Sequence, residues 1–475
     1  MINGLKPYPA YKDSGVPWLG EVPKHWEVRR LKYAVSFFGG GTPSKADASF
    51  WNGHIPWVSP KDMRRSRITD AIDHITDEAV SASATNLVPP SAVLLVVRSG
   101  ILRRAIPVAI NEVEVALNQD MKALQPRCGL IAEYLCALIQ GNESKLITEW
   151  TKQGATVESI EHQLLANSQI PLPPFPEQAA IVRFLDHMDR RIRRYIRAKQ
   201  KLIKLLEEQK QAIIHRAVTR GLDPNVRLKP SGIEWLGDVP DHWRVVRNGQ
   251  LFAQRNETGF PELPILEVSL RTGVRIRDFG VTDRKQVMTE REKYKRAAKG
   301  DIAYNMMRMW QGAVGITPID GLVSPAYVVA RPIGRTEPRY FSALFRTNMY
   351  MGEVDKYSHG IVKDRNRLYW EDFKQMPTPC PPPEEQVQIA DAIDQRTATI
   401  NIATDQIQRE TSLLREYRTR LLTDVVTGKL DVREAAARLP DDIEESEPLD
   451  DAEPLSDTDA EAVDDLDAAS EEDEP

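Results

Sequence analysis

The chain has 475 residues, of which 41% are hydrophobic and 28% are charged, a composition typical of a soluble globular protein with about three or four structural units. The formal net charge of −6 hides two opposite parts, because residues 440–475 contain eighteen Asp and Glu and no Lys or Arg. Without that segment, 63 basic residues face 69 − 18 = 51 acidic ones, so the body carries about +12. A basic body favours a polyanion such as nucleic acid as partner over a merely solvated surface.

Several classes of protein are disfavoured by the same inspection. The longest purely aliphatic run, residues 93–97, is far too short to cross a membrane, and the first residues lack the apolar core of a signal peptide. Three cysteines, at positions 128, 136 and 380, show no metal-binding spacing. We therefore expect a cytoplasmic protein with no bound metal. The acidic segment 437–475 is predicted to be disordered, because it has few apolar side chains to bury. It either aids solubility or contacts the basic body.

A short sequence near the N-terminus occurs again in the middle of the chain. Residues 14–26 and 231–243 are identical at nine of thirteen positions, with the shared pattern Trp-Leu-Gly-x-Val-Pro-x-His-Trp. Each copy contains a histidine, His25 or His242, but no Cys or Glu/His spacing accompanies it. We expect both histidines to be structural, beside the tryptophans that follow them.

Two variable regions, residues 28–151 and 245–358, follow these copies and share little identity. Each reads as a mixture of short strands and loops, with a buried strand expected at residues 92–97. The glycine-rich run Gly39–Lys45 lacks the spacing of a phosphate-binding loop, and Pro43 removes an amide that such a loop would use.

A long helix is predicted after each variable region. Pro-Pro-Phe-Pro-Glu-Gln opens residues 173–223, Gly221 lies at their end, and no Pro or Gly lies between 177 and 220. Residues 381–436 repeat the pattern 208 positions later, beginning Pro-Pro-Pro-Glu-Glu-Gln. Apolar residues keep a heptad spacing in both segments, which is typical of a coiled-coil seam. The predicted seam comprises Ile181, Leu185, Met188, Ile192, Tyr195, Leu202, Leu206 and Ile213 in the first helix, and Ile389, Ile393, Ile400, Ile407, Leu414 and Leu421 in the second.

Two lone seams in one molecule most simply bury each other, as an antiparallel intramolecular coiled coil. Because the N-terminus resumes the pattern where the second helix ends, the repeats predict a pseudo-twofold molecule of circular topology. The expected fold class is α+β, with two globular domains separated by two long helices. The expected boundaries are 1–172 for the first domain, 173–223 for the first helix, 224–380 for the second domain, 381–436 for the second helix and 437–475 for the acidic tail.

These motifs resemble the specificity subunits of type I restriction–modification systems. The resemblance rests on the two Pro-rich helix starts, on Gly40-Gly41-Thr42-Pro43 with Ile55-Pro56-Trp57-Val58, and on residues 305–312, Asn-Met-Met-Arg-Met-Trp-Gln-Gly. It covers about residues 11–435 and leaves out the acidic tail.

The resemblance implies two target recognition domains, each reading one half of a bipartite double-stranded DNA sequence, with the helices as a ruler between them. It implies two modification subunits and, in the full complex, restriction subunits of a bacterial or archaeal phage-defence system. Adenine methylation with S-adenosylmethionine, and ATP- and Mg-dependent cleavage, belong to those partners, so this chain is expected to be non-catalytic and without cofactor. Consistently, residues 87–90 and 172–175 lack the polar residue that precedes Pro-Pro in the base-binding loop of adenine methyltransferases. The alternatives are a stand-alone DNA-binding or regulatory protein and an enzyme with an unrecognised active site.

Base edges and phosphates are contacted by Arg, Lys, Asn and Gln. The candidates in the first domain are Lys61, Arg64, Arg65, Arg67, Arg98, Arg103, Arg104 and Lys152, and those in the second are Arg271, Arg275, Arg277, Asn305, Arg308, Gln311, Lys363, Arg365 and Arg367. For any single candidate a solvated surface charge is an equally good interpretation, whereas Trp57 and Trp310 are expected in the core. Residues 190–204 carry eight Lys or Arg and no acid, so this part of the first helix faces spacer DNA, an acidic partner or solvent.

Overall fold

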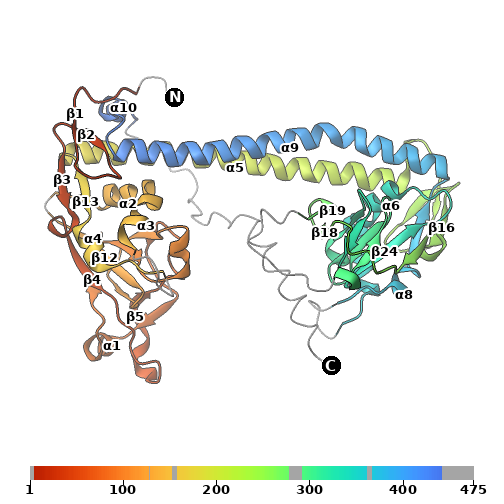
Figure 1. Cartoon of the computed structure of the whole chain (residues 1–475), viewed down its shortest axis with the longest axis horizontal. Coiled ribbons are helices and arrows are strands. Elements are labelled where there is room, and N and C mark those ends of the chain that lie inside the picture. Colours follow the sequence, from red (N-terminus) through yellow and green to blue (C-terminus); the bar gives the residue numbers. More distant parts are fainter. Residues whose placement is uncertain (1–4, 128, 152–157, 278–290, 361–365, 441–475) are drawn as a thin grey trace. The chain divides into compact units, whose positions relative to one another are not determined.

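The computed structural model describes residues 5–127, 129–151, 158–277, 291–360 and 366–440 (Figure 1). The candidates Lys152, Lys363 and Arg365, and the acidic residues 441–475, lie outside the described residues. The described chain divides into two compact units, which we call unit 1 (residues 5–198 and 409–440) and unit 2 (residues 199–408). Both units mix helices and sheets, in agreement with the α+β class expected from the sequence.

Two long helices contribute to both units, α5 (Phe175–Arg220) and α9 (Pro383–Val426). The other elements of unit 1 are β1 (Tyr11–Asp13), β2 (Glu21–Pro23), β3 (Glu27–Arg30), η1 (Leu31–Tyr33), β4 (Val35–Gly39), η2 (Ala48–Phe50), β5 (Trp51–Val58), β6 (Arg67–Ile68), β7 (Asp73–Ile75), α1 (Asp77–Ala82), β8 (Leu87–Val88), β9 (Val93–Val96), η3 (Gly100–Arg103), β10 (Val108–Asn111), β11 (Val115–Leu117), β12 (Met121–Pro126), α2 (Ala132–Gly141), α3 (Glu143–Trp150), α4 (His162–Asn167), β13 (Gln169–Leu172) and α10 (Arg433–Ala437). Those of unit 2 are β14 (Leu228–Pro230), β15 (Asp238–Pro240), β16 (Arg244–Arg247), η4 (Asn248–Gln250), β17 (Phe252–Arg255), β18 (Leu266–Ser269), β19 (Gly273–Ile276), η5 (Arg291–Lys293), β20 (Lys295–Ala297), β21 (Ile302–Asn305), η6 (Met309–Gln311), β22 (Val314–Ile316), β23 (Gly321–Val323), β24 (Tyr327–Pro332), α6 (Pro338–Phe345), α7 (Asn348–Tyr357), α8 (Trp370–Phe373) and β25 (Pro377–Cys380).

Each variable region forms a sheet that contains four strands in the same order, and the sheet of unit 1 has β6 as a fifth strand. In unit 1 the order is β4-β12-β9-β10-β6, and in unit 2 it is β17-β24-β21-β22. The central strands β9 and β21 are followed by the short helices η3 and η6. All four residues of β9 are buried, because apolar groups cover both of its faces, as the run at residues 92–97 predicted. Two regions with little sequence identity thus share one four-stranded topology.

The two sheets differ in what is attached to them. Unit 1 adds a second sheet of order β7-β5-β11-β8, whereas unit 2 adds the hairpin β18–β19 and the two-stranded sheet β20–β23. Figure 1 shows α2 and α3 between the long helices and the strands of unit 1. The repeated segments form matching small pairs, β1–β2 with β3–β13 in unit 1, and β14–β15 with β16–β25 in unit 2.

Within each unit, α5 and α9 belong to the same hydrophobic core. In unit 1, Ile181 and Leu185 of α5 share a cluster with Leu421 of α9, and Asp189 forms an ion pair with Arg418. In unit 2, Val218 near the end of α5 shares a cluster with residues near the start of α9. The residue that follows α9 closely, Gly428, has a φ of +78°, and a Cβ there would lie 2.4 Å from a ring carbon of Pro23. Only glycine fits this turn, which allows the helix end to meet the N-terminal strands.

Two residues of the seam predicted from heptad spacing are exposed in the structure, and the residue after each of them is buried or half-buried instead. Tyr195 and Leu202 are 54% and 45% exposed, whereas the next residue in each case, Ile196 or Ile203, is buried or half-buried. Both positions of each pair are apolar, so hydrophobic spacing alone allowed either register. Of the remaining predicted seam residues, Ile181, Leu185, Ile192, Ile389, Ile393, Ile400, Ile407 and Leu421 are buried, and Met188, Leu206, Ile213 and Leu414 are half-buried.

Candidate nucleic-acid interface

The glutamate of each Pro-rich helix start accepts hydrogen bonds from the repeated His-Trp pair. In unit 1, Glu177 accepts from Trp26 Nε1 at 2.8 Å, from Tyr8 Oη at 2.5 Å and contacts His25 Nε2 at 2.8 Å. In unit 2, Glu385 is bound in the same way by the indole of Trp243 and the imidazole of residue 242. Both histidines therefore have structural contacts in the described chain, as the sequence predicted.

The glutamine that follows each glutamate joins the long helix to the variable domain. The Gln178 side-chain oxygen accepts from the backbone N–H of Ile131, just before α2, at 2.9 Å, while its amide donates to Pro173 O at 2.9 Å. Gln386 makes the equivalent pair of bonds, accepting from Glu337 N just before α6. The Glu-Gln pair of each helix start is thus a joint, in which one carboxylate holds the repeated segment and one amide holds the helix that follows the sheet.

A tyrosine in each domain completes this joint. Tyr134 of α2 donates towards Pro171 O of β13 and Val426 O at the end of α9, both at 3.1 Å. Tyr340 of α6 bonds Val218 O near the end of α5 at 2.9 Å, in the equivalent place. Burial raises the pKa of both phenols, so both stay protonated. The arrangement of the two joints serves to position each sheet against the helices.

In both units, the loop after the central strand of the sheet is bound by a backbone hydrogen bond from a later segment of the chain. Ile160 N donates to Val97 O at 2.8 Å in unit 1, and Leu368 N donates to Met306 O at 2.9 Å in unit 2. Each loop therefore leaves its sheet beside a returning segment of chain. We call residues 98–104 the first sheet loop and residues 306–312 the second sheet loop.

The first sheet loop carries three of the predicted DNA-binding residues. Arg98 Nε donates to Asp120 Oδ1 at 2.7 Å, and Arg103 Nε donates to Glu158 Oε1 at 3.1 Å. Both guanidinium groups remain more than half exposed, and Arg104 is exposed beside them. The carboxylates orient the arginines without burying them, so their remaining N–H donors face solvent.

The second sheet loop carries Arg308 and Gln311, of which Gln311 is exposed. Asn305, at the end of β21, uses its side-chain oxygen to accept from Met307 N at 2.9 Å, which is a turn-forming role. Trp310 is half-buried, and its indole donates to Met307 O at 2.9 Å. Arg367 lies on the returning segment, where its backbone pairs with His359. The structure therefore brings these four candidates to one end of the second sheet.

A second group of candidates lies on the connection between β5 and β6. Lys61, Arg64 and Arg65 are exposed there. Asp62 holds the connection in place, because its carboxylate accepts from Ser59 N at 2.8 Å and from the backbone N–H of residue 72 at 2.9 Å. Arg67 is different, because it bridges Glu112 and Glu133 at 3.2 Å each while its side chain stays 48% exposed. Trp57, on β5, is buried and donates to Gly41 O.

The remaining candidates lie on the β18–β19 hairpin. Arg271 is exposed in its turn. Arg275 forms an ion pair with Glu267 on the opposite strand, and Arg277 is half-buried with its backbone N–H donating to Ile265 O at 3.0 Å. The basic stretch at residues 190–204 lies within α5, where Arg190 and Arg193 pair with acids one turn earlier.

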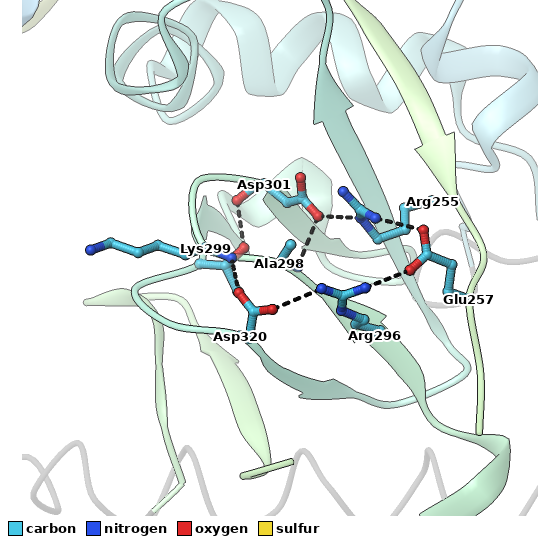
Figure 2. A network of polar contacts seen from close by, with 8 residues as sticks. Arg255, Glu257, Arg296, Ala298, Lys299, Asp301 and Asp320 are labelled. Atoms are coloured by element: carbon cyan, nitrogen blue, oxygen red, sulfur yellow. Dashed lines mark hydrogen bonds and ion pairs between the residues drawn. The ribbon is translucent and has the colours of Figure 1, made fainter. Parts of the chain in front are cut away.

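A cluster of charges at the opposite end of β21 pairs two arginines with three carboxylates. Figure 2 shows Arg255 between Asp301 and Glu257, and Arg296 between Glu257 and Asp320, in one chain of ion pairs. Asp301 is buried and also accepts from Ala298 N. The hydrogen bonds and arginines lower the pKa of the Asp320 carboxyl, which therefore stays ionised. These arginines are bound by carboxylates and hold the sheet together, so they are poor candidates for contacting DNA.

Two further searches of the described residues gave negative results. No three or more His, Cys, Asp and Glu side chains gather there as a metal site would require. None of the helices in the described part of the chain combines the length and apolar character needed to span a bilayer.

Sequence reasoning missed the joint residues, namely the two tyrosines and the partners of the two Glu-Gln pairs. The pair itself was visible as a repeat, but nothing in it identified which groups its side chains bind. The tyrosines lie at an offset of 206, within regions that otherwise share little identity, so a search of each region for isolated repeated aromatics was the available signal.

Comparison with known proteins finds a family model and relatives with names that refer to specificity. Residues 23–205 match the family model of the type I restriction modification DNA specificity domain. The chain is 40% identical over 183 residues to the specificity subunit of the type I restriction enzyme EcoR124I/EcoR124II of Escherichia coli, covering 38% of this chain and 42% of that protein. It is 30% identical over 177 residues to the specificity subunit of the type I restriction enzyme MjaIX of Methanocaldococcus jannaschii, covering 36% and 39%.

The chain thus spans less than half the length of these two relatives. A solved structure described as showing complex assembly and conformational transition of the type I R-M system superimposes with a TM-score of 0.61. That match covers 85% of this chain and 98% of the other at 17% identity, which shows a common fold.

Proposed function

We propose that this chain, whose residues 23–205 match the family model of the type I restriction modification DNA specificity domain, is the DNA-recognition subunit of a type I restriction–modification enzyme. The observation that carries the proposal is the duplication of one sheet topology on one repeated joint. Two units with the same sheet topology but dissimilar loops suit the recognition of two different DNA sequences. Each unit then reads one half of a bipartite sequence in double-stranded DNA.

The contacts with DNA are assigned to the exposed groups at the loops. Arginine and glutamine reach base edges in the major groove, and lysine and arginine hold phosphates. In unit 1 these groups come from the first sheet loop and from Lys61, Arg64 and Arg65. In unit 2 they come from the second sheet loop and the β18–β19 hairpin. Arg67 is left out of this set, because two carboxylates bind it.

The chain is proposed to be non-catalytic and to bind no cofactor itself. Two modification subunits would supply adenine methylation with S-adenosylmethionine, and restriction subunits would supply ATP- and Mg-dependent cleavage. The names of the relatives, all specificity subunits of restriction enzymes, support this division of labour. The assembly would act in the cytoplasm of a bacterium or archaeon.

The long helices are proposed to form an antiparallel coiled coil that sets the spacing between the half-sites. Heptad spacing and the ion pair of Asp189 with Arg418 support the pairing. The bridge between Lys6 and Asp431 and the fit of Gly428 against Pro23 support a circular topology, in which the N-terminal strands continue from the end of α9. The acidic tail is proposed to be disordered.

The test is methylation mapping. The chain is expressed with its neighbouring candidate modification subunit in a host without adenine methylation, and genomic DNA is sequenced for modified adenines. One bipartite motif that disappears when either chain is omitted is the expected result. A soluble assembled complex that leaves no motif would contradict the proposal.

The role of the helices has its own test. Insertion of one heptad into both α5 and α9 should lengthen the preferred spacer by about 10 Å, or three base pairs, because each helical residue adds 1.5 Å. Both half-sites should stay unchanged. A folded variant that keeps the original spacer would show that the helices do not set it.

A further inference from the structure

The β18–β19 hairpin is supported at its base by the neighbouring strand. Leu322 N, in β23, donates to Pro264 O at 2.8 Å. Leu266 and Val274 place their apolar side chains in a cluster with Val323. The opposite face carries the ion pair of Arg275 with its cross-strand neighbour. The hairpin therefore has one face fixed on the domain and one face of exposed polar side chains.

The turn of the hairpin is held by a side chain that no motif indicated. Arg346, just after α6, donates through one terminal nitrogen to Val314 O of β22 at 3.0 Å. Through the other it donates to Leu270 O at 2.6 Å and to Arg271 O at 3.0 Å. One guanidinium thus joins the turn to the edge of the main sheet.

The turn also touches that edge directly, backbone to backbone. A Cβ on Gly315 of β22 would lie 2.5 Å from Val274 N and 2.8 Å from Gly273 Cα, so only glycine allows the approach. Gly273 has a φ of +75°, which the turn requires. The turn and Arg346 also line a cleft of about 370 Å³ with Lys210 of α5. The position of Arg271 is therefore fixed by contacts with the sheet rather than by the hairpin alone.

We propose that Arg346 is a specificity-determining positioning residue for the half-site that unit 2 reads, which we call the second half-site. It holds the turn of residues 269–273 in place, so that Arg271 and Arg275 meet base edges in one register. The inference deepens the proposed function and rests on it. Arg346 itself contacts no DNA, because its guanidinium is half-buried and bound to three carbonyls.

The chemistry of the group explains why arginine is used. A guanidinium is planar and presents five N–H donors in a fixed arrangement, so it can bind three carbonyls at once, one from β22 and two from the hairpin turn. An ammonium is a compact charge on a flexible stem, and it would satisfy fewer of these carbonyls at once. The substitution Arg346→Lys keeps the charge and loses the geometry, whereas Arg346→Met keeps only an unbranched apolar stem and loses both.

The experiment measures methylation rates of the complex of the full chain with its modification subunit. The substrates are the cognate duplex and duplexes with one base changed in either half-site. In Arg346→Lys and Arg346→Met, the preference for the cognate base should fall about tenfold in the second half-site, as expected when a base contact loses its register. The preference in the first half-site, and the salt dependence of binding, should stay unchanged. Equal losses in both half-sites, or no loss in the second, would overturn the proposal.

Matched variants separate this outcome from others. Arg335→Met removes an exposed arginine of the same unit that pairs only with Glu384 in the described chain, and it should leave both preferences intact. Arg271→Ala should lower the same second-site preference; if it does not, the hairpin is not a reading element and the proposal fails while the proposed function stands. No methylation by the unaltered complex would instead refute the proposed function.

A second readout covers variants that fold poorly. Amide hydrogen exchange of the Arg346→Lys chain, followed by mass spectrometry, should accelerate in residues 266–276 and stay unchanged in β24. Acceleration throughout unit 2 would mean that Arg346 only stabilises the domain, and it would overturn the positioning role.

Discussion

Units 1 and 2 share the elements that hold their sheets against the long helices, and they differ in the strands attached to those sheets. Both have four central strands in the same order, a tyrosine between strand and helix end, and a Glu-Gln joint. They differ at the edges, where unit 1 adds a second sheet and unit 2 adds the β18–β19 hairpin and the β20–β23 pair. The comparison teaches that the repeated hydrogen bonds carry the architecture, because sheets with little sequence identity are held against the long helices by the same contacts.

The largest expected effect comes from the joint glutamates, which are not equivalent. The Glu177 side chain is 5% exposed and binds three side chains, whereas that of Glu385 is 22% exposed and binds two. Glu177→Ala should therefore lower the free energy of unfolding of unit 1 by about 3 to 5 kcal/mol, because it leaves Tyr8 and Trp26 with buried donors. Glu385→Ala should cost unit 2 about 1 to 3 kcal/mol. Urea unfolding measures both.

This first comparison has an internal control. Glu384→Ala removes the neighbouring acid, which is exposed and pairs with an exposed arginine, and it should change stability by less than about 1 kcal/mol. Equal losses for Glu177→Ala and Glu385→Ala would show that Tyr8, which has no counterpart in unit 2, adds nothing to the joint.

The second effect concerns one repeated position in the long helices. Ile196 is 4% exposed in unit 1, and Thr404 lies 208 residues later with a buried hydroxyl that has no hydrogen-bond partner in the described structure. Ile196→Ala should cost about 2 to 4 kcal/mol, and Thr404→Val should instead stabilise by about 1 kcal/mol. Thermal and urea unfolding of the two variants should move in opposite directions.

Tyr195→Ala is the matched control for this position, because Tyr195 is adjacent and 54% exposed. It should change stability by less than about 0.5 kcal/mol. A larger loss for Tyr195→Ala than for Ile196→Ala would restore the seam register predicted from sequence.

The third effect should be the same in the two units. Tyr134→Phe and Tyr340→Phe each remove a buried hydroxyl that bonds backbone carbonyls. Each should cost about 1 to 2 kcal/mol, since a buried carbonyl loses its donor without a change of shape. Losses that differ by more than about 1 kcal/mol would mean that the joint is equivalent in geometry but not in energy.

The sequence predicted what its repeats encode and missed what unrelated residues build together. The helices α5 and α9 followed from Pro and Gly positions and heptad spacing, and the structural role of His25 followed from the absence of partners with catalytic spacing. The seam register was ambiguous at Tyr195 and Ile196, because both are apolar and only packing chooses between them. The shared sheet order was invisible, because a buried strand needs only apolar residues of suitable size and so leaves little identity to compare.

Candidate DNA-binding residues were separated by their neighbours rather than by type. Arg67 and Arg104 are both exposed arginines, and Arg67 is bound by two glutamates, one just after β10 and one in α2. These acids lie 45 and 66 residues away from Arg67 in sequence, so no local pattern could identify them. The same holds for Arg346, whose three carbonyl partners are unrelated to its sequence context.

The smallest effect is a pH dependence confined to unit 1. The equivalent helices α3 and α7 begin differently, because Thr347 caps α7 with its hydroxyl while α3 begins with Glu143, which is largely buried and accepts from the backbone of Ile106. Burial raises the pKa of Glu143 to about 7, whereas an unfolded glutamate titrates near 4.3. Between these values the folded state binds more protons than the unfolded one, so stability falls as pH rises from about 4.5 to about 7 and then levels off.

Glu143→Gln removes this dependence while keeping an acceptor for the Ile106 N–H. The variant should therefore gain stability over the unaltered chain as pH rises, with the largest difference above pH 7 and little difference below pH 4.5. Melting temperatures of both chains from pH 5 to pH 8 measure the gap, and Glu149→Gln, in the same helix but exposed, is the control. A gap that stays constant over this range would show that Glu143 is ionised throughout. The hydrogen bond from the Ile106 N–H would then lower the pKa of Glu143 by more than burial raises it.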